Sequence, residues 1–365
     1  MRRLQFAAVC LLITFLSACS SNTNEQVLFQ ERPFDEILSQ GIDRYLGSFT
    51  PMESVTTDGV TNHRFGGGEG PQCLRGTEYT MSTRDAGASE LLIFLEGGGA
   101  CWSGLCAANE VAVPGMPTAG VLDPTLEVNP MRSWNVTYLP YCDGSLFSGD
   151  AQRDYTNDGI PEIHRGLRNL SAGLDVAVRE FPAPSRIVLA GNSGGGFGTI
   201  FALPLVRSLY PETPIDVIND SGVGVGRAND PTSQTVLIDD WRSNEFFPPS
   251  ICPDCFEPGN LVEYFDWQLN QDNNFNLAFL STKQDVVISA FFLMIPGADF
   301  EAAMIPALQQ VETRHPDRVR SFISNGALHT FLQRDVFQTA EGVTVHDWVS
   351  AMLNGESTWQ SLLDI

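Results

Sequence analysis

The segment Arg186–Thr199 constrains the fold more than any other part of this 365-residue chain. Its first part, Ile187–Ala190, is a short apolar run of strand formers, and an apolar pattern with helical spacing begins at Gly196. Between them stands Gly191-Asn192-Ser193-Gly194-Gly195, a G-x-S-x-G sequence. A strand that turns sharply into a helix needs glycine on both sides of the serine and holds the hydroxyl above the edge of a sheet. We therefore expect Ser193 to lie on a nucleophile elbow.

The rest of the chain alternates between strand patterns and helix patterns. We expect strands at Leu91–Leu95, Trp134–Leu139, Ile215–Ile218, Phe275–Leu280 and Val319–Ile323, and helices at Gly166–Phe181, Asp299–Thr313 and near the C-terminus. Strands that alternate with helices imply a mostly parallel sheet with helices on both faces, and such sheets bind ligands at the carboxyl ends of their strands. The predicted fold class is α/β, of the α/β-hydrolase type.

Three segments fall outside this alternation. Phe34–Phe49 is predicted to be an amphipathic helix, and Val60–Thr83 an early hairpin that carries Cys73. Residues 222–272 are irregular and rich in aromatic side chains, and a loop of this length inside a compact domain is usually functional, so we expect a lid-like insertion. The alternative is that its aromatic residues close a peripheral core. We expect residues 31–365 to form a single domain.

The N-terminal residues indicate export. Arg2-Arg3 is basic, Leu4–Phe15 is apolar but short for a membrane span, and Leu16-Ser17-Ala18-Cys19 resembles a bacterial lipobox. We expect residues 1–18 to be removed as a signal peptide, residues 19–30 to form a polar tether, and Cys19 to anchor the protein by lipid in the bacterial cell envelope, at the outer membrane or the cell surface. The alternative is an ordinary signal peptide cut near Ala18.

Six cysteines remain after the signal peptide has left and Cys19 has been acylated. An even number in an exported protein argues for disulfides. We expect Cys101–Cys106 to brace a local loop, Cys73–Cys142 to form a longer tie, and Cys252–Cys255 to be the remaining pair, as a small disulfide or as free thiols. No second C-x-x-C and no nearby histidine accompany Cys252–Cys255, so no metal site is expected.

The charge balance excludes two classes of partner. The formal net charge is −23, and Lys283 is the only lysine. A uniformly acidic surface argues against nucleic acid and against adsorption to anionic lipid. The expected contact with a membrane is therefore only the N-terminal lipid anchor, and a monomer is the favoured oligomeric state.

A serine nucleophile needs a base, and the base needs an acid that orients it. The preferred base is His329, which follows the strand at Val319–Ile323, and its rival is His346 on the C-terminal helix. The other three histidines, His63, His164 and His315, are expected at the surface.

The orienting acid should follow a strand between the serine and the histidine. Asp285 does so after Phe275–Leu280, although it would also suit a helix N-cap, and Asp220 after Ile215–Ile218 is the alternative. Ser193, Asp285 and His329 then occur in the chain order of an α/β-hydrolase.

Catalysis by a serine nucleophile also needs donors for a tetrahedral oxyanion. The amide of Gly194, directly after the serine, is the first candidate, and Gly98 and Gly99, after the strand at Leu91–Leu95, are the second source. The glycine run lacks the Gly-Lys-Ser/Thr ending of a phosphate-binding loop.

Together these motifs resemble one known family. The segments that carry the resemblance are Leu95–Trp102, Tyr141–Gly144, Gly191–Gly195, Asp285 and His329. They are similar to the pectin acetylesterase family, which includes the animal Notum carboxylesterases. The resemblance implies an α/β-hydrolase fold, ester hydrolysis without metal or cofactor, a Ser193–His329–Asp285 triad, and oxyanion donors from Gly98, Gly99 and Gly194. Many relatives carry a bulky aromatic residue where Gly99 or Ala100 stands, so the acyl pocket does not follow from the resemblance.

The function that we expect is a serine esterase that removes acetyl or other short acyl groups from carbohydrate. Its substrate would be an acylated glycan or a small neutral ester. The first alternative is a lipase-like or depolymerase-like esterase for longer acyl groups or polyesters. The second is a non-catalytic surface binding protein that retains the fold.

Overall fold

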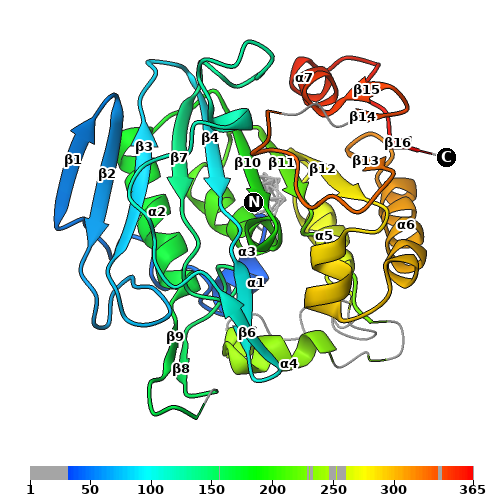
Figure 1. Cartoon of the computed structure of the whole chain (residues 1–365). Helices are drawn as coiled ribbons and strands as arrows, with labels where there is room; N and C mark the ends of the chain where they lie inside the picture. The colour runs from blue at the N-terminus through cyan, green and yellow to red at the C-terminus, as the bar shows by residue number, and fades with distance from the viewer. Residues whose placement is uncertain are drawn as a thin grey trace, which may run out of the picture. The chain divides into compact units, whose positions relative to one another are not determined.

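The computed structural model describes residues 32–155, 157–227, 230, 233–245, 252, 260–335 and 339–364. A ten-stranded sheet lies at the centre of the part that begins at Pro33 (Figure 1). In spatial order, its strands are β1 Glu53–Thr57, β2 Val60–Phe65, β3 Tyr79–Arg84, β7 Asn135–Leu139, β4 Glu90–Leu95, β10 Arg186–Asn192, β11 Ile215–Asp220, β12 Phe275–Thr282, β13 Val319–Ser324 and β16 Leu362–Leu363. From β7 to β16 neighbouring strands are parallel, and β1, β2, β3 and β7 are joined antiparallel.

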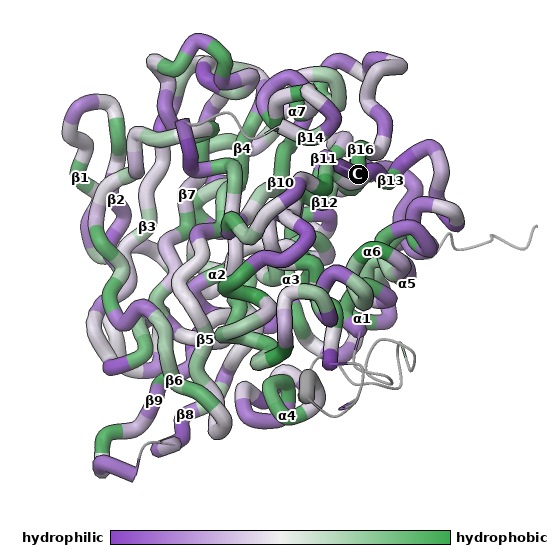
Figure 2. Tube along the Cα trace, turned by 45° about the vertical axis from the view of Figure 1, so that its right-hand side comes forward, coloured by the Kyte–Doolittle hydropathy of each residue, from purple (hydrophilic) through white to green (hydrophobic). Residues whose placement is uncertain are grey.

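Apolar side chains on alternate positions of the strands form two cores. In β4, Leu91, Ile93 and Leu95 pack into the larger core, and Leu92 and Phe94 pack into the smaller one on the other face. Strands buried on both faces are rich in apolar residues, as in the middle of β10, which is green in Figure 2. The prediction of an α/β fold with a mostly parallel sheet is confirmed.

The helices cover both faces unequally. The larger core receives residues from α2 Gly166–Glu180, α3 Gly194–Leu209, α5 Val262–Gln271 and α6 Gly297–Arg314, and the smaller core receives them from α7 Val345–Asn354. Pro204 lies inside α3, yet the helix continues for five more residues to Leu209. No single helix in the described ranges is long and apolar enough to cross a membrane, and one pair bent by 105° passes that test only jointly.

The shorter elements lie mainly in the connections. They are α1 Asp35–Ser39, β5 Gly99–Trp102, β6 Leu105–Ala108, η1 Gly120–Leu122, β8 Ala151–Arg153, β9 Glu162–His164, α4 Ser233–Asp240, η2 Ser243–Glu245, the π-helix η4 Val287–Leu293, β14 Thr339–Ala340 and β15 Val343–Thr344. The helix predicted at Phe34–Phe49 is wrong beyond α1, because the chain turns after Ser39.

The segment predicted to be an irregular insertion is partly helical. Residues 222–272 contain α4 and α5, and among its described aromatic residues Trp241, Tyr264 and Phe265 are buried in the larger core. For these residues the alternative prediction, that they close a core, is the correct one. Phe246, Phe247 and Phe256 lie outside the described residues.

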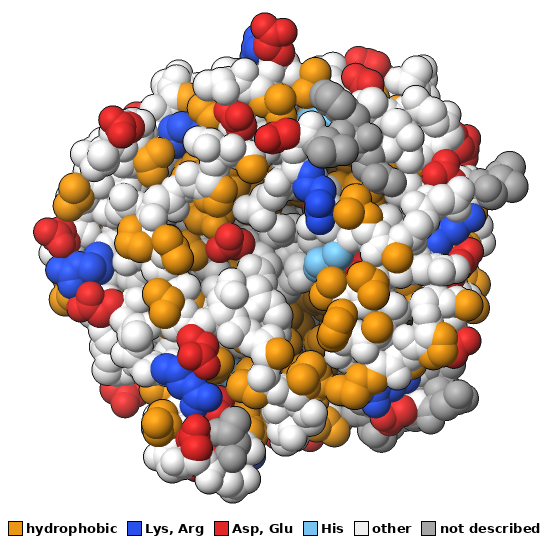
Figure 3. Space-filling model, in the orientation of Figure 1, with side chains coloured by type: hydrophobic (Ala, Val, Ile, Leu, Met, Phe, Trp, Pro, Cys, Tyr) orange, Lys and Arg blue, Asp and Glu red, His pale blue; other side chains and the backbone are white. Residues whose placement is uncertain are grey.

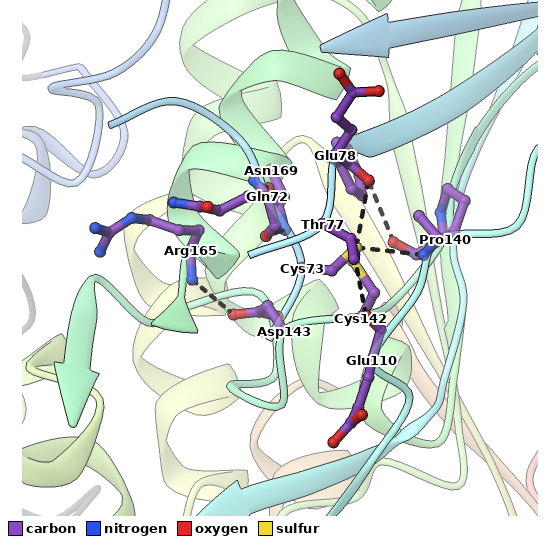
Figure 4. Close-up of a disulfide and its surroundings, with 12 residues drawn as sticks. Gln72, Cys73, Thr77, Glu78, Glu110, Pro140, Cys142, Asp143, Arg165 and Asn169 are labelled. Atoms are coloured by element: carbon purple, nitrogen blue, oxygen red, sulfur yellow. Dashed lines mark hydrogen bonds between the residues drawn. A yellow bond between two sulfur atoms is a disulfide. The ribbon is translucent and has the colours of Figure 1, made fainter. Parts of the chain in front are cut away.

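Two of the predicted disulfides are present, Cys73–Cys142 and Cys101–Cys106. Figure 4 shows the first, which ties the segment before β3 to the segment after β7. Beside it, a carboxylate oxygen of the buried Asp143 accepts a hydrogen bond from the amide of Arg165 at 3.1 Å, directly before α2. Cys252 is also disulfide-bonded, and its predicted partner Cys255 lies outside the described residues, as do the predicted signal peptide, Cys19 and the tether.

Candidate active site

Ser193 stands on a strained turn between β10 and α3. Its backbone has φ 53° and ψ −122°, outside the usual regions for a residue with a side chain. The glycines at positions 191 and 195 are needed because a side chain at either position would clash with the backbone. A Cβ on Gly191 would lie 2.1 Å from the carbonyl oxygen of Gly195, and a Cβ on Gly195 would lie 2.0 Å from that of Leu95. The predicted strand–turn–helix geometry around Ser193 is confirmed.

His329 pairs with Asp285. Its Nδ1 lies 2.8 Å and 3.0 Å from the two carboxylate oxygens of Asp285, which is fully buried. One of these oxygens also accepts hydrogen bonds from the amides of Val287 and Ile288, each at 3.0 Å, at the start of η4. The N-cap role and the contact with the histidine therefore coexist, as the sequence allowed.

The other ring nitrogen of His329, Nε2, does not contact Asp285. Within the described ranges Nε2 has no hydrogen-bond partner. When Nδ1 carries the proton donated to Asp285, Nε2 is an acceptor, which is the state a general base requires. No hydrogen bond joins it to Ser193 in this structure, and such bonds often tighten only when substrate is bound.

Residues 325–335 follow β13 and carry His329, and we call them the histidine loop. Hydrogen bonds hold this loop to the end of β11. One carboxylate oxygen of Asp220 accepts from the amides of Phe331 and Leu332, both at 2.8 Å. The hydroxyl of Ser221 accepts from the amide of Thr330 at 3.1 Å. Because the amide of Ser193 donates to the carbonyl of Asp220 at 2.8 Å, the elbow and the histidine loop share one anchor.

Asp220 is thus not the partner of the histidine ring. It is fully buried, and burial raises the pKa of its carboxyl to about 6, against the opposing effect of the Leu332 and Phe331 amides. Of the two acids that the sequence left open, Asp285 is the one that contacts the His329 ring.

The glycine run after β4 lies against the elbow. The amide of Gly97 donates to the side-chain oxygen of Asn192 at 2.8 Å, so it is already occupied. A Cβ on Gly98 would lie 2.6 Å from Asn109 and 2.7 Å from Tyr141, and the carbonyl of Gly99 approaches Gly194. The roles of the Gly98, Gly99 and Gly194 amides as oxyanion donors stay predictions.

Asn192 is a site residue that the sequence did not single out. Its side-chain oxygen holds Gly97, and its amide nitrogen donates to Gln333 of the histidine loop at 2.7 Å. One side chain therefore joins the glycine run, the elbow and the histidine loop. Its place directly before Ser193 in the motif was the only available signal.

An apolar pocket of about 190 Å³ opens at Ser193. Its wall includes Gly99, Ala100 and Gly194 near the serine, and Ile288 and Phe292 of η4. In Figure 3, hydrophobic side chains gather around a hollow on this face beside a histidine.

The other histidines differ from the prediction that placed three of them at the surface. His63 is buried between the hydroxyls of Ser54 and Thr83, and His315 is buried against Asp266. His164 is fully buried, and desolvation lowers the pKa of its imidazole to about 4. A Gly-rich setting suggested exposure for His63, and charged neighbours suggested it for His164 and His315. Polar groups from other elements make all three interior sites.

His346, the rival base, lies in α7 on the side of the smaller core. It is buried, and burial lowers the pKa of its imidazole. No cluster of three or more His, Cys, Asp or Glu side chains suited to a metal ion occurs in the described part of the chain.

Comparison with known proteins places part of the chain in a family. Residues 67–237 match the model of the pectinacetylesterase family. This part of the chain belongs to that family. The pectinacetylesterase region includes Ser193 and the glycine run, whereas Asp285 and His329 lie beyond it.

Two curated proteins are similar to part of the chain. The chain is 28% identical over 168 residues to palmitoleoyl-protein carboxylesterase notum2 of Xenopus laevis, a match that covers 41% of this chain and 33% of that protein. It is 28% identical over 149 residues to pectin acetylesterase 4 of Arabidopsis thaliana, which covers 38% of this chain and 36% of that protein. The chain thus spans about a third of the length of these relatives.

Proposed function

We propose that this protein is a serine carboxylic-ester hydrolase that works through an acyl-enzyme. The observation that carries the proposal is the contact of His329 with the buried Asp285, together with the shared anchor Asp220, which holds both the loop of His329 and the elbow of Ser193. The family membership of residues 67–237 and the names of the relatives, a carboxylesterase and an acetylesterase, support the same reaction class.

The reaction follows from the roles of these side chains. The Ser193 oxygen attacks the ester carbonyl carbon while Nε2 of His329 takes its proton, and Asp285 stabilises the resulting imidazolium. The amide of Gly194, with Gly98 and Gly99, donates to the oxyanion. The intermediate collapses to the acyl-enzyme, and the leaving alcohol takes the proton from His329. Water then repeats the cycle and releases the carboxylic acid.

The alcohol part of the substrate is proposed to be a carbohydrate, as the name of the plant relative suggests. With a net charge of −23, the protein should repel polyanionic pectin, so acetylated neutral glycans should react faster than acetylated pectin at low salt. The test is acetate release from acetylated xylan and acetylated pectin across a salt series. Faster turnover of pectin at low salt would contradict the charge argument.

The acyl part has two candidates. Acetyl follows from the plant relative, and a longer acyl group follows from the apolar pocket beside Ser193. The pocket wall carries no charged side chain among its lining residues, which favours the longer group.

The protein is proposed to act outside the cytoplasm while anchored through lipid on Cys19. Its disulfides are typical of exported proteins, and the lipobox-like sequence before Cys19 supports the anchor. Metabolic labelling with a palmitate analogue should mark the wild type but not Cys19→Ala. An unlabelled wild type would contradict the anchor.

The experiment that tests the function compares Ser193→Ala with the wild type on aryl esters and with a fluorophosphonate probe. We expect ester hydrolysis to fall by about 10³-fold or more, with the fold retained, because the side chain is small and stands at a turn. Probe labelling should also be lost. A wild type that neither reacts with the probe nor hydrolyses any ester would instead support the non-catalytic binding protein.

A further inference from the structure

Two cavities meet at one side chain, Phe292. The first is the apolar pocket of about 190 Å³ that begins at Ser193. The second, of about 250 Å³, is lined by apolar residues such as Trp102, Leu237 and Met294 and also by the ion-paired Arg227 and Asp230. Among the described residues, Phe292 is the one that lines both cavities, so the two cavities adjoin at this residue.

The ring of Phe292 is held by neighbours from two other elements. Its centroid lies 5.7 Å from that of Trp102 in β5, edge to face, and 5.3 Å from that of Phe197 in α3. The backbone that carries it is the π-helix η4, whose first amides are held by Asp285. Irregular helices of this kind occur frequently at functional sites. The wall is thus tied to the same carboxylate that contacts His329.

The size of the first pocket exceeds what an acetyl group needs. An engineered apolar cavity of about 150 Å³ binds benzene, which has six carbons. By that standard a pocket of about 190 Å³ accepts an aliphatic chain of roughly six to eight carbons. An acetyl methyl would leave most of it unfilled.

We propose that this pocket selects aliphatic acyl groups of about six to eight carbons and that Phe292 is the wall that sets the upper limit. The proposal rests on the ester-hydrolase function proposed above and names its acyl substrate. Phe292 acts as a specificity-determining residue, because it touches the acyl chain and not the reacting atoms.

The first test is the chain-length dependence of the wild type. With p-nitrophenyl esters from acetate to palmitate, each at concentrations where the ester is monomeric, kcat/KM should rise about fourfold per methylene, which corresponds to about 0.8 kcal/mol. The rise should stop at about six to eight carbons and be followed by a fall. Maximal kcat/KM with the acetate ester would overturn the proposal.

The second test removes the wall. Phe292→Ala joins the two cavities, so the optimum should move to esters of ten or more carbons, with a gain of about tenfold or more for laurate relative to hexanoate. The acetate ester should change by less than about threefold. The matched control is Val286→Ala, an exposed residue beside the same segment that lines neither cavity, and its profile should follow the wild type.

The third test introduces a larger side chain at Ala107 to fill part of the first pocket. Its result does not depend on whether the Phe292→Ala variant folds. Ala107 lines the first pocket and is exposed, so Ala107→Leu is compatible with the fold. It should lower kcat/KM for hexanoate and octanoate by about tenfold while leaving acetate within about threefold. Profiles of Phe292→Ala and Ala107→Leu that both match the wild type would overturn the proposal.

The outcomes separate this proposal from the function on which it rests. Hydrolysis with an unselective or acetate-centred profile contradicts the acyl limit alone. Absence of hydrolysis for every ester, together with absence of labelling by a fluorophosphonate probe, contradicts the esterase function itself.

Discussion

The ends of β11 and β12 each present a fully buried aspartate, and the two carboxylates have different partners. Asp285, three residues after β12, holds the His329 ring and the first amides of η4. Asp220, the last residue of β11, holds only backbone amides of the histidine loop and a neighbouring hydroxyl. Asp285 therefore contacts the imidazole ring that would transfer the proton, whereas Asp220 contacts the backbone of the loop that carries this ring.

This comparison shows why burial alone does not identify a catalytic acid. Both side chains are inaccessible to water, and burial raises the pKa of Asp220 to about 6, a shift that would mark it as a functional candidate. Only the hydrogen-bond partners distinguish the roles. We infer that Asp285 orients His329 and that Asp220 is a positioning residue for the loop.

The largest expected effect is the difference in kcat between the two variants in which Asp285 or Asp220 is replaced by asparagine. Asp285→Asn should lower kcat by about 10³- to 10⁴-fold, because an amide facing Nδ1 favours the wrong tautomer of His329. The side-chain oxygen can still accept from Val287 and Ile288, so the fold should persist. Asp220→Asn should stay within about tenfold of the wild type. The measurement is kcat for a p-nitrophenyl ester with active-site titration, and comparable losses in the two variants would remove the distinction.

A second, smaller effect examines the positioning role. Asp220→Ala leaves the amides of Phe331 and Leu332 without their acceptor, at a cost of about 2–4 kcal/mol in the free energy of unfolding. The looser loop should also lower kcat by about ten- to a hundredfold. Urea denaturation and kinetics on the same preparation check both, and Asp220→Asn should recover most of each. Equal behaviour of the two variants would show that the amides find other acceptors.

The third effect is a pH dependence of stability. The native state keeps the Asp220 proton up to about pH 6, whereas the unfolded chain loses it near its ordinary pKa of 3.8. Between these values the native state binds more protons, so the contribution of Asp220 to stability falls as pH rises and then levels off above pH 6. The total fall is on the order of 3 kcal/mol, since one pKa unit corresponds to about 1.36 kcal/mol.

Asp220→Asn should remove this part of the slope, as measured by urea unfolding between pH 4 and pH 7. The matched control is Asp143→Asn, because burial also raises the pKa of the Asp143 carboxyl to about 6 at a site beside α2. Each variant should remove the part of the pH dependence of the unfolding free energy that its own carboxyl contributes. An unchanged slope in Asp220→Asn would place the carboxyl in a more polar setting than its burial implies.

The smallest effect concerns the rival histidine. Asp285 contacts the ring of His329, which makes His329 the expected general base. His346→Ala should therefore change kcat by less than about threefold, whereas His329→Ala should lower kcat as much as Ser193→Ala. Kinetics per folded molecule, with the folded fraction taken from circular dichroism, make the comparison. A reversed pair of results would transfer the role of base to His346 and leave Asp285 as a structural cap.

Much of the fold could be predicted because its signals are local. Runs such as Leu91–Leu95 are apolar without interruption, which occurs where a strand is covered on both faces, and the observed strand is Glu90–Leu95. The elbow could also be predicted, because the glycines around Ser193 avoid clashes that are mostly local. A Cβ at these positions would meet atoms a few residues away or on the adjoining strand. The helix predicted over Phe34–Phe49 failed because apolar spacing alone does not keep a chain helical through Gly41 and Gly47, both of which have positive φ.

The sequence by itself therefore determined the main strands of the parallel part of the sheet, the helices α2, α6 and α7, the turn at Ser193, two disulfide pairs, and a short set of candidate acids and bases. Only the tertiary structure decided which acid meets which base, because His329 and Asp285 are 44 residues apart and meet through the neighbouring positions of β12 and β13 in the sheet. It also decided the bridge through Asn192, the burial of His63, His164 and His315, and the wall at Phe292. Each of these depends on contacts between distant segments, which local propensity and spacing do not encode.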